Sequence, residues 1–348
     1  MGESSLMQNI VQRENYLDVA KGIALFGVVL GHLVNFGGTA FTWIFSFHMM
    51  LFFFISGYQF NSNKYINYKF TEYFDKKVKT ILIPYVIVTI IGIIACIIIP
   101  SWRGFGANIY YYLFYLAQPE NLQVGQIWFL ACLFWTEILF FYFYKKMFSH
   151  LHTVSIIFII ILISIVGFNM NLVSLFTYPR IPWKLDSSIT ALVFYSTGFY
   201  TKRIGLIDKL YEYSKFVSAI ILISCGVLGF YIAEYKNGYV NISDCQYGNY
   251  IYFYIAAFCG ILFVMLFSKY LANNKILQYY GRNTLWMFSL HSFLLYISVY
   301  ILNLITQQHY IRMSNIPFVY CLIIAIIIYL TLGLIPFVIK YCKKIKLP

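Results

Sequence analysis

Ten stretches of predominantly apolar residues follow one another along this chain, and each is close to the length that a helix needs to cross a bilayer. About 20 helical residues span the ~30 Å of hydrocarbon. Because lipid offers no water to hydrogen-bond the backbone, such stretches are expected to be helical. The pattern predicts an all-α, polytopic integral membrane protein with about ten transmembrane helices. The predicted spans are 17–37, 41–60, 81–100, 127–145, 153–169, 186–201, 215–233, 250–268, 284–305 and 317–341.

The composition fits a lipid environment and excludes a set of soluble domains. Hydrophobic residues make up 61% of the 348 residues, charged residues 11%, and the mean hydropathy is +0.73. A formal charge of +13 would suggest nucleic acid for a soluble protein, but here most of the 25 Lys and Arg residues fall on the side of both termini. The positive-inside rule then places both termini in the cytoplasm of a plasma or inner membrane. We expect a cytoplasmic N-terminus (1–16), a membrane domain (17–341), a basic cytoplasmic tail (342–348) and no nucleic-acid partner.

The first predicted span carries three ionisable residues, which are rare in lipid and often functional. Asp18 and Lys21 lie near its cytoplasmic end, and His32 follows Lys21 by 11 positions. At ~100° and 1.5 Å per residue, these steps return to within ~20° of the starting direction, roughly 16 Å farther along the helix. Lys21 and His32 are therefore predicted to share one helix face. Alternatively, Lys21 could simply extend its ammonium to the membrane surface, with Asp18 as its ion-pair partner.

Further ionisable side chains lie in other spans. His48 falls in the outer half of the second span, and an imidazole can both take and give a proton near neutral pH. A single histidine in a helix is as often a packed core residue as a reactive one, but two histidines with an aligned lysine favour a shared polar cavity. Glu137 in the fourth span could orient a histidine or accept a proton, or could only hydrogen-bond a neighbouring helix. His291 in the ninth span ranks below His32 as a catalytic candidate.

Three lysines, Lys76, Lys77 and Lys79, are predicted to lie in a cytoplasmic loop one turn before the third span. Ordinary positive-inside bias explains most clusters of this kind. Ammonium groups at the mouth of a cavity would also hold a polyanion such as the phosphates of a nucleotide-like cofactor. The sequence has no glycine-rich phosphate loop and no metal-ligand spacing of Cys, His and carboxylates. No metal site is predicted.

The chain resembles the membrane-bound acyltransferase family 3, whose members acylate surface polysaccharides and lipid-linked sugars. LDVAKGIALFGVVLGH is similar to the Arg/Lys-x10-His element of this family, with Lys21 and His32 in the two marked positions. The remaining similar blocks follow in the order of the family within 17–291. They are FSFHMMLFFFISGY, KKVKTILIPY, IWFLACLF, PWKLDSSITALVFYSTGFY and YYGRNTLWMFSLH.

The resemblance implies an O-acetyltransferase that takes an acetyl or other acyl group from cytoplasmic acyl-CoA and passes it to a hydroxyl of a cell-envelope glycan or glycolipid. Acetyl-CoA would be the donor substrate, and a homo-oligomer is compatible with the sequence. His32 would be the general base and His48 would complete the polar cavity, while Asp18 would keep Lys21 in place. Glu137 completes the set of catalytic candidates. Lys21, Lys76, Lys77 and Lys79 would hold the anionic donor.

Two other classes remain open. A transporter for a glycan precursor could use His32 and His48 as a proton relay, although the sequence shows no internal repeat of the kind that many transporters contain. A protein that binds acyl-CoA without turnover would protect the donor and yield no product. A covalent mass gain of the glycan that depends on acetyl-CoA would separate the enzyme from both.

Overall fold

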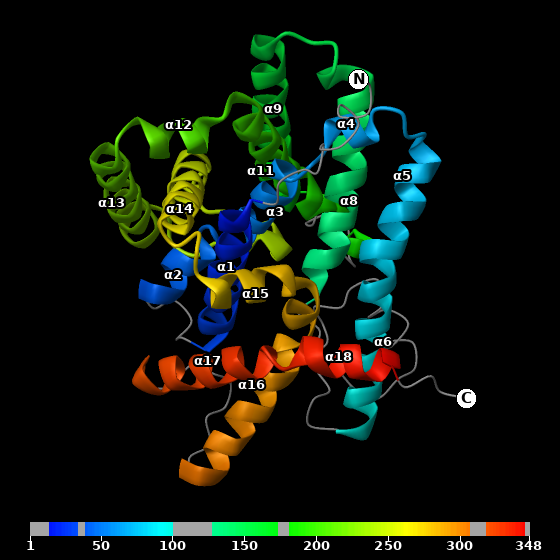
Figure 1. The fold of residues 1–348 in the computed structure, drawn as a ribbon, viewed down its shortest axis with the longest axis vertical. Coiled ribbons are helices and arrows are strands. Elements are labelled where there is room, and N and C mark those ends of the chain that lie inside the picture. The colour runs from blue at the N-terminus through cyan, green and yellow to red at the C-terminus, as the bar shows by residue number, and fades with distance from the viewer. Residues whose placement is uncertain (1–13, 34–38, 100–126, 173–180, 307–317, 345–348) are drawn as a thin grey trace, which may run out of the picture.

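The protein is helical throughout the part of the chain that the structure describes. The computed structural model describes residues 14–33, 39–99, 127–172, 181–306 and 318–344. Within these ranges, β-structure is limited to one isolated bridge between Asn241 and Gln246. The helices form one assembly with α1 and α3 near its centre (Figure 1). The all-α prediction is confirmed.

Nine segments within the described ranges are long and apolar enough to cross a membrane. They are built from α1 (Asn15–Leu33), α2 (Thr39–Phe45) with α3 (His48–Tyr58), α5 (Phe70–Lys77) with η1 (Val78–Leu82) and α6 (Ile83–Ile98), α8 (Trp128–Phe143) with η4 (Tyr144–Phe148), α9 (Thr153–Phe168), α13 (Lys215–Ile232) with η6 (Ala233–Asn237), α14 (Tyr250–Tyr270), α16 (Thr284–Thr306), and α17 (Phe318–Leu332) with α18 (Ile335–Lys344). The short elements are α4 (Ser62–Tyr65), η5 (Pro182–Lys184), α12 (Leu206–Tyr213), η7 (Ile242–Asp244) and α15 (Lys275–Arg282).

The sixth predicted span, 186–201, which is not among these nine segments, forms a helix that is more polar than the others. It is α11 (Leu185–Ile204), which has 20 residues. Its buried side chains include Asp186, Ser188 and Thr190, because α11 packs among α3, α8 and α9. Neighbouring helices therefore shield the polar groups of α11 from lipid. With 20 residues, α11 is long enough to cross a membrane, although it is less apolar than the nine segments above.

The third span begins earlier than the sequence predicted. A continuous helical segment runs over Phe70–Ile98, whereas the prediction began at residue 81. The carboxylate of Glu72 accepts a hydrogen bond from the backbone N–H of Lys69 at 2.8 Å and so caps the helix start, and Tyr73 is fully buried. The prediction that Lys76, Lys77 and Lys79 lie in a loop is therefore wrong. These lysines lie on the helix itself, because a buried aromatic face extends the helix beyond the apolar run.

The second span is interrupted where the sequence predicted one continuous helix. α2 ends at Phe45 and α3 begins at His48. Ser46 Oγ donates to the carbonyl of Trp43 at 2.7 Å, and His48 Nδ1 donates to the carbonyl of Ile44 at 2.7 Å. These side chains supply partners for backbone carbonyls at the end of α2, which a break inside lipid requires.

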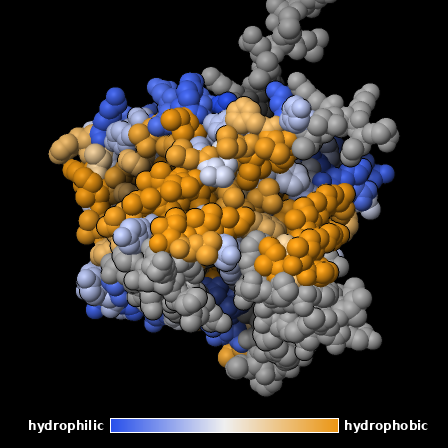
Figure 2. All heavy atoms as spheres, turned by 90° about the horizontal axis from the view of Figure 1, so that it is seen from below, coloured by the Kyte–Doolittle hydropathy of each residue, from blue (hydrophilic) through white to orange (hydrophobic). Residues whose placement is uncertain are grey.

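Helices at the centre and at the edge of the assembly differ in what they bury. Every residue of α3 except Ser56 is buried. By contrast, few residues of α9 and α13 are buried, and their exposed side chains include Ile157, Phe158, Phe216 and Ile223. A broad zone of hydrophobic residues, with hydrophilic residues along its margins, also covers the face in Figure 2. Exposed apolar surface of this extent is what lipid-facing helices present.

Candidate active site

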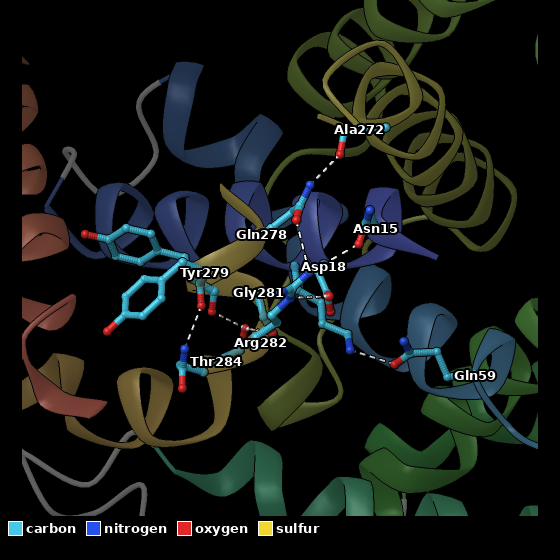
Figure 3. Close-up of polar contacts among 12 residues, drawn as sticks. Asn15, Asp18, Gln59, Ala272, Gln278, Tyr279, Gly281, Arg282 and Thr284 are labelled. Atoms are coloured by element: carbon cyan, nitrogen blue, oxygen red, sulfur yellow. Dashed lines mark hydrogen bonds and ion pairs between the residues drawn. The ribbon is translucent and has the colours of Figure 1, made fainter. Parts of the chain in front are cut away.

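An ion pair with α15 holds the N-terminal end of α1. Asp18 is fully buried, and its Oδ2 accepts a hydrogen bond from Arg282 Nε at 3.2 Å. The same guanidinium donates from Nη2 to Asn15 at 3.2 Å and to Gln278 at 3.0 Å (Figure 3). Because a guanidinium presents several donors in one plane, Arg282 links α1 and α15 in a defined geometry.

Two glycines allow α15 to lie directly against α1. A Cβ atom on Gly281 would collide with the backbone carbonyl of Asp18, and one on Gly22 would collide with the carbonyl of Leu277. The start of α15 is fixed by Asn274, whose side chain accepts a hydrogen bond from the N–H of Leu277 at 3.0 Å. Small residues at such crossings let two backbones approach closely. This approach places the Arg282 guanidinium beside Asp18.

Lys21 is half-buried and contacts α3. Its Nζ donates to Oε1 of Gln59 at 2.6 Å, just after the last residue of α3. The sequence suggested Asp18 as the residue that keeps Lys21 in place. That role of Asp18 stays a prediction. The structure adds a partner for Asp18, Arg282, which lies 264 positions away and which no local pattern could have revealed. Lys21 and Gln59 thus form a second link at this end of α1.

The other end of α1 meets α16 through two histidines. The rings of His32 and His291 are stacked, with centroids 5.4 Å apart and planes inclined by 24°. His291 is fully buried, whereas His32 is half-buried. Sequence reasoning ranked His291 below His32 and did not include it in the site. An ionisable residue inside a span was the available signal, but its partner could only be found from the packing of α16 against α1.

His48 joins these histidines through an aromatic residue. The ring of Phe45 contacts His32 edge-on, with centroids 5.8 Å apart, and contacts His48 at 4.9 Å. Phe45 also contacts Tyr239, with ring centroids 6.0 Å apart. Burial raises the pKa of Tyr239 to about 12, so its hydroxyl remains protonated at neutral pH. The cluster of His32, His48 and His291 therefore lies beside a neutral phenol in the segment between η6 and α14.

Glu137 lies in a different contact, between α8 and the segment that carries the lysines. It forms an ion pair with Lys77 and accepts a hydrogen bond from Tyr73 at 3.1 Å. Lys76 Nζ donates to the hydroxyl of Tyr65 at 3.1 Å, and Lys79 is exposed. The carboxylate of Glu137 thus has two bonded partners on α5 and an evident role in joining two helices.

The four lysines predicted to hold an anionic cofactor differ in their exposure and in their partners. Lys21 and Lys76 are half-buried, and Lys79 is exposed. The positive charge of Lys77 is paired with the carboxylate of Glu137. Within the ranges that the structure describes, no three His, Cys, Asp or Glu side chains are arranged to hold a metal ion.

Comparison with known proteins gives one match over nearly the whole chain. A family model described as an acyltransferase domain, that of acyltransferase family 3, matches residues 14–333. The matched region contains all the contacts described above. Neither the curated proteins nor the solved structures gave a match.

Proposed function

The chain belongs to acyltransferase family 3, and from this premise we propose that it is an integral membrane O-acetyltransferase. It takes the acetyl group from acetyl-CoA at the cytoplasmic side and esterifies a hydroxyl of an envelope glycan or glycolipid. The observation that carries the proposal is the pair of stacked imidazoles at one end of α1, with Lys21 near the other end.

In this proposal, His32 acts as the general base. Its ring is half-buried and, among the described residues, makes ring contacts and no hydrogen bond, so its nitrogens are available to a substrate. In direct transfer, His32 takes the proton of the acceptor hydroxyl and the oxygen attacks the thioester carbonyl. A C–O bond forms, the C–S bond breaks, and the imidazolium returns the proton to the CoA thiolate. His48 supplies a further imidazole in the same cluster, across the ring of Phe45.

The donor is held by ammonium groups in this proposal. Lys21, Lys76 and Lys79 are accessible to phosphate groups, whereas Lys77 already has the carboxylate of Glu137 as its counter-ion. We therefore assign Lys76 and Lys79 the larger share of the phosphate contacts. An ammonium binds phosphate as a point charge and not as a bidentate fork, so several lysines would act together.

Transfer of labelled acetyl in membrane vesicles tests the proposal. Vesicles with their native glycans receive acetyl-CoA labelled in the acetyl group, and ester-linked label is measured. We expect label with the wild-type protein, and a loss of about 10²–10⁴-fold with His32→Ala, the usual contribution of a general base. His150→Ala, which removes an exposed histidine, is the matched control. Wild-type product formation by His32→Ala would refute the assigned base.

A proton-coupled glycan transporter is the second candidate, and the three clustered imidazoles favour it because they suit a proton relay. A carrier changes the location of its cargo and leaves the covalent structure untouched. Mass spectrometry of the surface glycan, with and without this protein, separates the candidates. Ester groups that depend on the protein support the enzyme, and an unchanged glycan mass supports the carrier.

A further inference from the structure

One ring nitrogen of His291 has no hydrogen-bond partner among the residues that the structure describes. Nδ1 of His291 lies against the backbone carbonyl of Phe288. A carbonyl oxygen only accepts, so Nδ1 carries the proton, and in the neutral ring Nε2 is then an acceptor. Nε2 is buried and has no hydrogen-bond partner among the described residues. A buried polar atom without a partner is rare in native proteins.

Packing alone does not account for a histidine at this position. Leaving a buried acceptor unsatisfied costs about 1–3 kcal/mol, whereas a phenylalanine would fill similar space without that cost. The ring contacts Phe288, with centroids 5.2 Å apart, as well as His32. Both contacts could be made by an apolar ring. The unpaired nitrogen is therefore a group available to a ligand, and it lies next to the residue assigned as the base.

We propose that Nε2 of His291 accepts a hydrogen bond from a hydroxyl of the acceptor substrate, next to the hydroxyl that His32 deprotonates. The inference rests on the proposed function and deepens it. Two stacked imidazoles receive two hydroxyl groups, so the acceptor is a polyol such as a sugar and not a simple alcohol. His291 remains neutral throughout, since the proton of the reacting hydroxyl goes to His32. It is thus a second catalytic residue that touches the substrate.

The test compares His291→Phe with His291→Gln in the labelled-acetyl vesicle assay. Phenylalanine keeps a ring and removes the acceptor, whereas glutamine keeps an acceptor oxygen. We expect His291→Phe to lower the rate about 10-fold or more, the equivalent of one lost hydrogen bond, with an unchanged KM for acetyl-CoA. His291→Gln should be distinctly faster than His291→Phe. Wild-type turnover by His291→Phe, or an equal loss in both variants, would overturn the inference.

Ser289→Ala is the matched control, because Ser289 is buried on the same helix and bonds only the carbonyl of Leu285 within the described residues. If His291→Phe does not fold, His291→Ala is assayed with added imidazole or pyrrole. Imidazole has an acceptor nitrogen and pyrrole has none, so the inference requires recovery with imidazole alone, and any other result overturns it. Failure of the proposed function is distinguishable, because the wild-type protein would then transfer no label.

Discussion

The two ends of α1 use polar side chains in different ways. At the N-terminal end, Asp18 and Lys21 bond to Arg282 and Gln59, which belong to other parts of the chain. At the C-terminal end, His32 makes ring contacts, and Nε2 of its neighbour His291 has no hydrogen-bond partner within the described ranges. Groups whose bonds are satisfied join helices together, whereas groups with unused hydrogen-bonding capacity can serve a substrate. This difference within one helix separates residues that position the site from residues that can react in it.

The largest expected effect is on the acetyl-transfer rate, and it comes from the C-terminal end of α1, where His32 lies. His32→Phe keeps a ring against Phe45 and His291 and removes both nitrogens. We expect the acetyl-transfer rate to fall by about 10²–10⁴-fold, while the free energy of unfolding changes by less than about 1.5 kcal/mol. Initial rates and detergent-induced unfolding of the purified protein measure the two quantities. A large loss of stability with an unchanged rate per folded molecule would place His32 among the residues that hold helices together and not among those that react.

An experiment can decide whether Glu137 joins two helices or takes part in the reaction. Glu137→Leu leaves the ammonium of Lys77, whose side chain is only 13% exposed, without its counter-ion. We therefore expect a loss of about 3 kcal/mol in the free energy of unfolding, the low end of the range for a buried pair. The double variant Lys77→Met/Glu137→Leu should recover most of that loss, because an apolar pair can replace a buried ion pair. A double variant that is stable yet inactive would place Glu137 among the reactive groups.

Substitutions at the N-terminal end of α1, where Asp18 and Lys21 are bonded to other parts of the chain, should lower the free energy of unfolding. Arg282→Ala leaves the fully buried carboxylate of Asp18 without its guanidinium. We expect a loss of about 2–3 kcal/mol, less than for a fully buried pair, because the Arg282 side chain is 44% exposed. Lys275→Ala removes an exposed charge from the same helix and is the control. Equal unfolding curves for the two variants would show that this ion pair does not hold α15 against α1.

A smaller effect is expected where α17 contacts α1. The hydroxyl of Tyr329 donates to the backbone carbonyl of Gly22 at 2.9 Å. Tyr329→Phe should cost about 1 kcal/mol in the free energy of unfolding, the net value of one hydrogen bond. Tyr320→Phe, at an exposed position of the same helix, is the control and should cost less. Equal stability of these two variants would show that the Tyr329 hydrogen bond does not help to hold α17 against α1.

Much of the fold could be predicted from local pattern. Apolar runs of sufficient length gave the helices and their approximate bounds, and the spacing of Lys21 and His32 is a property of one helix. The resemblance to acyltransferase family 3 is confirmed by the family match. The sides of the termini and the roles of the site residues stay predictions. The early start of the third span was missed because a polar run with one buried aromatic face, around Tyr73, has low mean hydropathy.

The partners of the ionisable residues could not be predicted in the same way. Arg282 is separated from Asp18 by most of the chain, and His291 is similarly distant from His32. The break between α2 and α3 depends on the side chain of His48 reaching the carbonyl of Ile44. Each feature arises from contacts between helices or across a break, and the apolar pattern of a single helix does not encode them.

The sequence by itself determined that this protein is a bundle of membrane-crossing helices with ionisable residues at both ends of the first one. Hydrophobic length and helical period are local quantities, so a single chain segment is enough to specify them. Only the tertiary structure decided that Asp18 is bonded to Arg282 and that His32 is stacked on His291. Lipid is as apolar as the helix surfaces, so hydropathy does not select the neighbours of a helix, and close packing with a few polar contacts does.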